Sequence, residues 1–93
     1  MKLVVMYRPE SEFSRAVETF VGDFKRRHEG VGRRIEVINV DSREGMANMS
    51  LYDIMEQPAL MVLSDDGQAL KIWTGSVLPL MDEVAAYFYT TQT

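Results

Sequence analysis

Short runs of apolar and β-branched residues predict four strands in this chain. Leu3–Met6 and Ala59–Leu63 are continuously apolar, which is typical of strands covered on both faces, and Ile35–Val40 is rich in β-branched residues. Asp65-Asp66-Gly67 is a turn sequence, and it predicts that Gln68–Trp73 returns antiparallel to the preceding strand as a hairpin.

Apolar residues at three- and four-residue spacing predict a long first helix. Ser11 is its expected N-cap, and its apolar face comprises Phe13, Ala16, Val17, Phe20, Val21 and Phe24. We expect the helix to end near Gly30 and Gly32. The basic residues from Lys25 to His28 fit that end, because cations complement the negative end of a helix dipole.

Two shorter helices are predicted further along. Asp41-Ser42 begins one that runs through Met46, Met49 and Ile54, with Gly45 inside it. The other has Ser76 as its cap and Pro79 in its first turn, and its apolar face comprises Leu80, Met81, Val84, Ala85 and Phe88.

The order strand, helix, strand, helix, strand, strand, helix predicts a layered α/β fold. Two strands joined by a helix pair in parallel through a right-handed crossover, whereas the final hairpin is antiparallel. The chain has 93 residues, of which 46% are hydrophobic, and this suffices for one core without metals or crosslinks. Residues 1–93 are therefore predicted to form a single domain.

Charge and composition narrow the classes of partner. The net charge of −4 argues against nucleic acid, and no apolar run approaches the roughly 20 residues of a membrane-spanning helix. The basic segment from Lys25 to Arg34 is interpreted as a solvated helix end, with a phosphate-binding patch as the alternative. The first apolar run is too short for a signal peptide, so we expect a cytoplasmic protein.

The segment Tyr7-Arg8-Pro9-Glu10-Ser11-Glu12-Phe13-Ser14 lies where the first strand leads into the first helix. It resembles the aromatic-Arg-Pro-Gly-Cys-x-x-Cys turn of the thioredoxin-like superfamily in its minimal, glutaredoxin-type form, with Ser11 and Ser14 in the two cysteine positions. The segment from Tyr52 to Leu60 is similar to the one in which that family places a cis-proline before its third strand. Gly67 and Gly75 match family glycines.

This resemblance implies a βαβαββα fold with a four-stranded mixed sheet in the order 2-1-3-4. Helices one and three would cover one face, helix two would cover the other, and the Pro58 peptide bond would be cis. It also implies a peptide-binding groove, in which the backbone of the residue before the proline pairs with an extended partner. The candidate binding residues are Tyr7, Arg8, Ser11, Ser14, Gln57, Pro58, Thr74, Gly75 and Ser76.

Serine in the two cysteine positions changes the chemistry. The chain contains no cysteine, so it cannot carry out thiol–disulfide exchange on its own residues. A serine hydroxyl needs an adjacent base to become a nucleophile, and His28, the one histidine, lies about 25 Å from Ser11 if the helix between them is continuous. We therefore expect Ser11 to cap the helix and Ser14 to reinforce its first turn, and we predict no catalytic residue.

The leading interpretation is a redox-inactive thioredoxin-like domain that binds a protein or peptide through the Pro58 loop and the start of helix one. The alternative is a protein that binds glutathione or another small thiol, as the N-terminal domains of glutathione transferases do, with Tyr7 or Ser11 as the contact. A weaker idea is anion binding at the start of helix one, where free backbone N–H groups, the two serine hydroxyls and Arg8 converge, but the charges of Glu10 and Glu12 oppose it. Self-association is left open.

No cofactor or metal is predicted. The chain has seven methionines, but Met46, Met49, Met61 and Met81 fall on apolar faces, where filling the core explains them better than copper binding. Asp65 and Asp66 are turn formers.

Overall fold

The structure is a computed structural model, and it describes residues 1–32 and 34–90. The elements follow in the order β1 (Lys2–Tyr7), α1 (Ser14–Arg27), α2 (Glu29–Gly32), β2 (Ile35–Asn39), α3 (Arg43–Leu51), β3 (Ala59–Leu63), β4 (Ala69–Thr74) and α4 (Met81–Thr90). This is the predicted order with one addition, the short helix α2.

The strands form one mixed sheet in the order β2-β1-β3-β4, as predicted. β1 pairs in parallel with β2, where Val5 lies opposite Val37. On its other side β1 pairs antiparallel with β3, where Val5 lies opposite Leu60, and β3 and β4 form the expected antiparallel hairpin. The central strands β1 and β3 are therefore paired along both edges.

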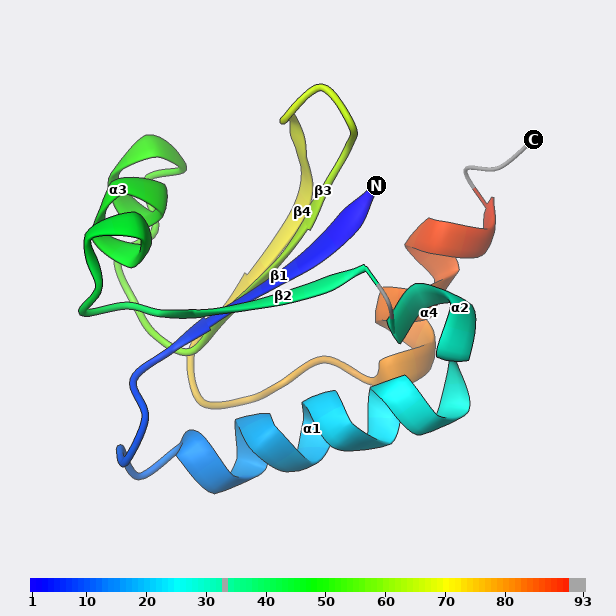
Figure 1. The fold of residues 1–93 in the computed structure, drawn as a ribbon, viewed down its shortest axis with the longest axis horizontal. Helices are drawn as coiled ribbons and strands as arrows, with labels where there is room; N and C mark the ends of the chain where they lie inside the picture. The colour runs from blue at the N-terminus through cyan, green and yellow to red at the C-terminus, as the bar shows by residue number, and fades with distance from the viewer. Residues whose placement is uncertain (33, 91–93) are drawn as a thin grey trace.

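Helices cover both faces of this sheet. Helices α1 and α4 lie on one face and α3 lies on the other (Figure 1). Successive side chains of a strand point to opposite faces, so Leu3 and Val5 join the core beneath α1 and α4, and Val4 and Met6 join the core beneath α3. Burial on both faces explains why the first strand is an unbroken apolar run.

Helix α1 begins at Ser14, three residues after the predicted cap, so the expectation that Ser11 is the N-cap is wrong. Phe13 occupies the N-cap position and makes no capping hydrogen bond with its side chain. Two turns precede the helix: the Ser11 amide donates to the Arg8 carbonyl and the Ser14 amide to the Ser11 carbonyl, both at 3.2 Å. The α-helical pattern starts only where the Val17 amide donates to the Phe13 carbonyl at 3.1 Å, after these two turns.

The apolar face of α1 is confirmed, since Val17, Phe20 and Phe24 are buried. The helix does not continue to Gly30 as predicted, because His28 leaves the helical conformation at φ −133° and ψ 67°. The chain then forms α2 as a separate short helix. The basic residues do lie in the last turn of α1, as expected from the helix dipole.

Helix α3 has the predicted cap, because the Ser42 hydroxyl accepts a hydrogen bond from the Gly45 amide at 2.9 Å. The helix ends at Leu51, so Ile54 is buried but lies beyond it. A Cβ atom on Gly45 would lie 2.1 Å from the Asn39 carbonyl oxygen. Glycine at this position therefore allows α3 to pack directly against the end of β2. Met46, which we expected in the core, is 58% exposed.

Helix α4 begins at Met81, so the predicted start at Ser76 is wrong. Gly75 has a φ of 97°, and a residue before proline disfavours the helical conformation, which keeps Leu78 out of a helix. Leu80 precedes the helix and is exposed rather than part of its apolar face. The rest of that face is confirmed, since Val84, Ala85 and Phe88 are buried.

Candidate functional site

Three segments that are distant in the sequence meet at the end of the sheet where β1 ends and β3 begins. The Arg8 amide donates to the Gln57 side-chain oxygen at 3.2 Å, which joins the β1–α1 turn to the loop before β3. The Gly75 amide donates to the Pro58 carbonyl at 3.0 Å, which joins that loop to the segment after β4. The Gln57–Pro58 peptide bond is cis, as the resemblance implies, and Pro58 is buried.

Gly75 occupies a position that favours glycine for two reasons. Its φ of 97° is a conformation that residues with a Cβ atom rarely adopt, and a Cβ atom there would lie 3.2 Å from a carboxylate oxygen of Glu56. Thr74 and Ser76, on either side of it, are exposed. The turn at Gly75 thus presents both neighbours to solvent beside Pro58.

The two serines that the resemblance aligns with cysteines behave differently. The Ser14 hydroxyl donates to the Ser11 carbonyl at 2.9 Å and so reinforces the first turn of α1, as predicted. The Ser11 hydroxyl oxygen is buried and has no hydrogen-bond partner among residues 1–32 and 34–90. Among the described residues no side chain that could act as a base forms a hydrogen bond with it.

Arg8 directs its guanidinium group to the end of β2. It donates to both carboxylate oxygens of Asp41, at 2.9 Å and 3.0 Å. The hydrogen bond and charge of Arg8 hold the pKa of Asp41 below its ordinary value. Sequence reasoning missed Asp41, although a signal existed: Arg8 follows β1 and Asp41 follows β2, and the carboxyl ends of parallel strands meet at one edge.

Tyr7 is turned toward the helix layer. Its ring is buried in the core beneath α1, and its hydroxyl donates to a carboxylate oxygen of Glu18 at 2.8 Å. The hydrogen bond to Glu18, together with burial, raises the pKa of Tyr7 above its ordinary value of 10.0. The Tyr7 hydroxyl therefore donates its proton to a hydrogen bond with α1 and does not donate it to a ligand.

We expect Tyr7→Phe to lower the free energy of unfolding by about 1 kcal/mol at neutral pH, through loss of this hydrogen bond. A raised pKa means that the folded state holds the phenolic proton more tightly than the unfolded chain does. The stability that Tyr7 contributes is thus complete below about pH 10 and is lost as the pH rises through the folded-state pKa. Urea unfolding of both proteins from pH 7 to pH 11 tests this. The difference between them should shrink above pH 10, and a constant difference would contradict the assignment.

Exposed apolar side chains occur in two of the segments that meet here. Met55 in the loop before Pro58 is 85% exposed, and Val77 and Leu80 in the segment after Gly75 are 86% and 76% exposed. Sequence reasoning named none of them as a binding residue and placed Leu80 in the core. The available signal was that Met55 and Val77 are large apolar residues in loops, outside any helical or strand periodicity.

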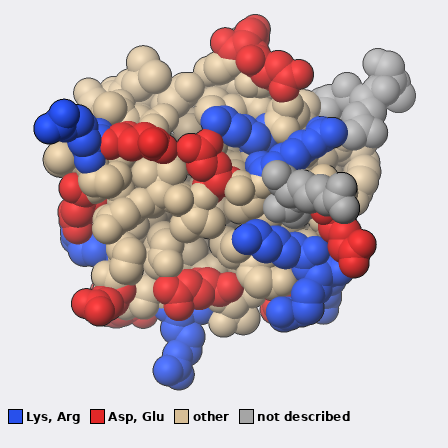
Figure 2. Space-filling view, in the orientation of Figure 1, with Lys and Arg blue, Asp and Glu red and all other residues tan. Residues whose placement is uncertain are grey.

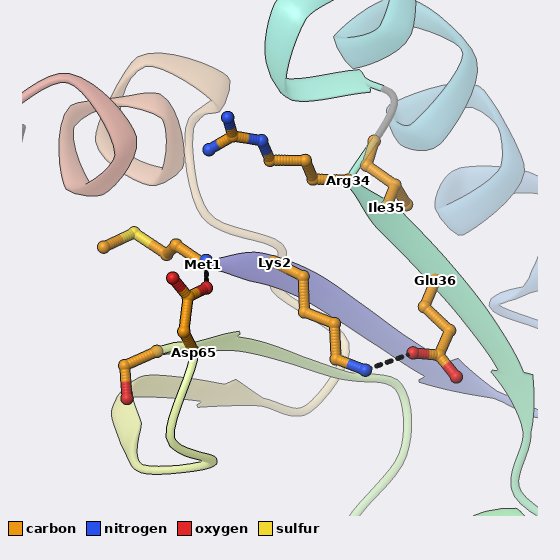
Figure 3. Close-up of a pocket in the computed structure, with 7 residues that line it drawn as sticks. Met1, Lys2, Arg34, Ile35, Glu36 and Asp65 are labelled. Carbon is orange, nitrogen blue, oxygen red and sulfur yellow. Dashed lines mark hydrogen bonds and ion pairs between the residues drawn. The ribbon is translucent and has the colours of Figure 1, made fainter.

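A hollow lies at the opposite end of the sheet, where β1 and β2 begin. Its volume is about 650 Å³, and Met1, Lys2, Arg34, Ile35, Glu36, Ser64 and Asp65 line it (Figure 3). Its charged groups largely pair with one another: Lys2 donates to Glu36 at 2.6 Å, and the Met1 amino group pairs with Asp65. We therefore do not assign a ligand to it.

Basic side chains lie together where α1 ends and α2 begins (Figure 2), consistent with Lys25, Arg26 and Arg27 in the last turn of α1. Among the described residues, no group of three or more His, Asp or Glu side chains could hold a metal ion. None of the described helices is long and apolar enough to cross a membrane.

Comparison with solved structures identifies the class of fold. Thioredoxin 1 from the thermophilic eubacterium Thermosipho africanus superposes over 100% of both chains, with a TM-score of 0.73 and 14% sequence identity. Mitochondrial thioredoxin 3 from Saccharomyces cerevisiae, in its oxidized form, matches 91% of this chain and 73% of its own, with a TM-score of 0.67 and 13% identity. The chain therefore has a thioredoxin-like fold, as the sequence predicted.

A germline-specific thioredoxin from Drosophila melanogaster, Deadhead, also matches, with a TM-score of 0.62 and 17% identity over 97% of this chain and 81% of its own. No protein-family model matches the sequence. No curated protein matches it either. At these identities the likeness establishes the fold and leaves the activity to be argued from the site.

Proposed function

We propose that this chain is a redox-inactive thioredoxin-like domain that binds a protein or peptide at the end of the sheet formed by the Pro58 loop and the start of α1. The observation that carries the proposal is the exposure of Met55, Val77 and Leu80 in the two segments that Pro58 and Gly75 join through a backbone hydrogen bond. Large apolar side chains exposed on a small protein favour an interaction site where they form one patch.

The chemistry of the junction supports binding rather than catalysis. The chain has no cysteine, the Ser11 hydroxyl has no base beside it in the described structure, and Ser14 serves the first turn of α1. In the family that the sequence resembles, the backbone before the proline pairs with an extended peptide. Gln57 would take that part here, with Arg8, Thr74 and Ser76 at the margins of the surface. We further propose a cytoplasmic location, which fractionation of the source cells would test.

Peptides selected for binding from a random displayed library provide the test. The double variant Met55→Asp and Val77→Asp should weaken the best selected peptide at least tenfold, because truncating buried apolar anchors commonly costs more than 1 kcal/mol. Leu51→Asp is the matched control, since Leu51 is 73% exposed on α3. Its affinity should stay within twofold of the wild type. Equal loss in both proteins, or no loss in the double variant, would refute the assigned surface.

Binding of glutathione or a similar small thiol is the second proposal. The unpartnered Ser11 hydroxyl favours it, whereas the Tyr7 hydroxyl already donates its proton to Glu18. Titration calorimetry with millimolar glutathione separates the two proposals. The absence of heat with the wild-type protein would remove this one and leave the peptide surface in place.

A further inference from the structure

Strand β2 has one free edge. It pairs only with β1, and no other strand in the described part of the chain lies beside it. The Arg34 carbonyl accepts from Leu3 and the Val40 amide donates to Tyr7, so even-numbered residues of this segment direct their backbone groups toward β1. In a parallel pair the alternate residues face the other way, so Val37 presents its N–H and C=O outward. The edge carries no proline, and its register is unbroken.

An apolar groove runs along this free edge on the face covered by α1. Its volume is about 220 Å³, and it is lined by Tyr7, Val17, Glu18, Val21, Gly22, Lys25 and Val37. Val37 lines this groove together with residues of α1 and is 47% exposed. Gly22 is not required by contacts within the chain, since a Cβ atom there would approach only the Arg26 guanidinium group, at 3.6 Å. Because glycine has no side chain, Gly22 adds no bulk to the part of α1 that lines the groove.

A second copy of the chain has the geometry to fill this groove. If β2 pairs antiparallel with β2 of the second copy about a two-fold axis at Val37, the two Val37 residues exchange both of their outward hydrogen bonds. The outward-facing Ile35 of each copy then lies opposite Asn39 of the other. Both Val37 side chains point to the face that carries α1, so each lies at the mouth of the other copy's groove.

The opposite charges of Glu18 and Lys25 on α1 are complementary across the same two-fold axis. A two-fold axis perpendicular to the sheet sets α1 antiparallel to α1 of the second copy. Glu18 and Lys25 line the groove at equal distances along the helix from the point between Val21 and Gly22. Val21, Gly22 and Val37 line the same groove, so an axis at Val37 that also passes this point would place Glu18 of each copy opposite Lys25 of the other. Lys25 makes no ion pair within the described residues.

We propose that the protein forms a two-fold dimer through the free edge of β2 and the exposed face of α1, which joins the two sheets into one of eight strands. Val37 lies at the axis, and two Glu18–Lys25 pairs between the copies set the register. This surface is separate from the peptide-binding end assigned above, so the two proposals are independent.

Molar mass in solution, measured by sedimentation equilibrium up to millimolar concentration at low ionic strength, is the first test. The wild type should approach twice the monomer mass of 10.6 kDa. Val37→Asp should keep it at the monomer mass, because two carboxylates would face each other at the axis. Val77→Asp is the control and should dimerise like the wild type. A monomeric wild type, a dimeric Val37→Asp protein or a monomeric Val77→Asp protein would each overturn the proposal.

Exchange of the charges gives a test that misfolding cannot mimic. Lys25→Glu alone and Glu18→Lys alone each place like charges together in a homodimer, so each should dimerise about tenfold more weakly than the wild type at low salt. Mixed together, the two variants restore two opposite-charge pairs. The mixture should therefore form a heterodimer with near wild-type affinity, and this gain should fade as salt is added. If the mixture associates no better than its components, the register is wrong.

Discussion

Gly45→Ala is expected to lower the free energy of unfolding by about 3 kcal/mol or more. The added methyl group would lie 2.1 Å from the Asn39 carbonyl oxygen and 2.8 Å from the Val40 Cα atom. Both are backbone atoms at the end of β2, so no side-chain rotation can make room. Helix α3 would have to move away from the sheet, which would open the core that Ile38 and Ile54 share.

Gly22→Ala is the matched control for this prediction. Gly22 also lies inside a helix, but the nearest atom to an added methyl group would be the end of the flexible Arg26 side chain, at 3.6 Å. Alanine is the better helix former, so this variant should gain about 0.5–1 kcal/mol. Urea unfolding at micromolar concentration compares the three proteins. Equal effects of the two substitutions would show that α3 is not held against β2 as described.

Phe24→Ala should cost about 3–5 kcal/mol, a large share of the roughly 5–15 kcal/mol that stabilises a domain of this size. Phe24 is fully buried and lies in the core between α1, α4 and the sheet. Its ring packs against those of Phe20 and His28, with centroids 5.9 Å and 5.0 Å away. Truncation would leave a cavity at the end of α1, where the chain turns into α2.

Two further variants separate burial from helix propensity. Phe24→Leu keeps most of the volume and should cost less than half as much as Phe24→Ala. Leu51→Ala removes a large apolar side chain that is 73% exposed at the end of α3, and it should change stability by no more than about 0.5 kcal/mol. Thermal and urea unfolding would measure all three. A cost for Leu51→Ala close to that for Phe24→Ala would contradict the described core.

Secondary structure was most predictable where one periodic pattern decided it. The apolar run of β1 reflects burial on both faces, and the spacing of Val17, Phe20 and Phe24 reflects one buried stripe of α1. Helix starts were less predictable. Ser11 and Ser76 are good capping residues, but two turns precede α1, which begins at Ser14, and the Leu78-Pro79 pair precedes α4, which begins at Met81. Ser42 caps its helix as expected, because its hydroxyl accepts a hydrogen bond from the Gly45 amide.

The candidate site divides in the same way. The segments around Arg8, Pro58 and Gly75 could be nominated from sequence because each carries local turn chemistry. The hydrogen bonds that join these segments could not be predicted from sequence. The bonds from Arg8 to Gln57 and from Arg8 to Asp41 connect residues 49 and 33 positions apart. Tyr7 was nominated for the site, yet its hydroxyl is bonded to Glu18 on α1. The direction that a side chain takes at the end of a strand depends on the residues packed around it.

By itself the sequence determined the layered α/β fold and the lack of cysteine, because periodicity and composition are properties of the chain alone, and the strand order was implied by the family resemblance. Only the tertiary structure decided which loop residues are exposed, which charged groups pair, and that β2 lies at the edge of the sheet. Those features depend on contacts between segments far apart in the chain, and such contacts exist only once the sheet and helices have packed.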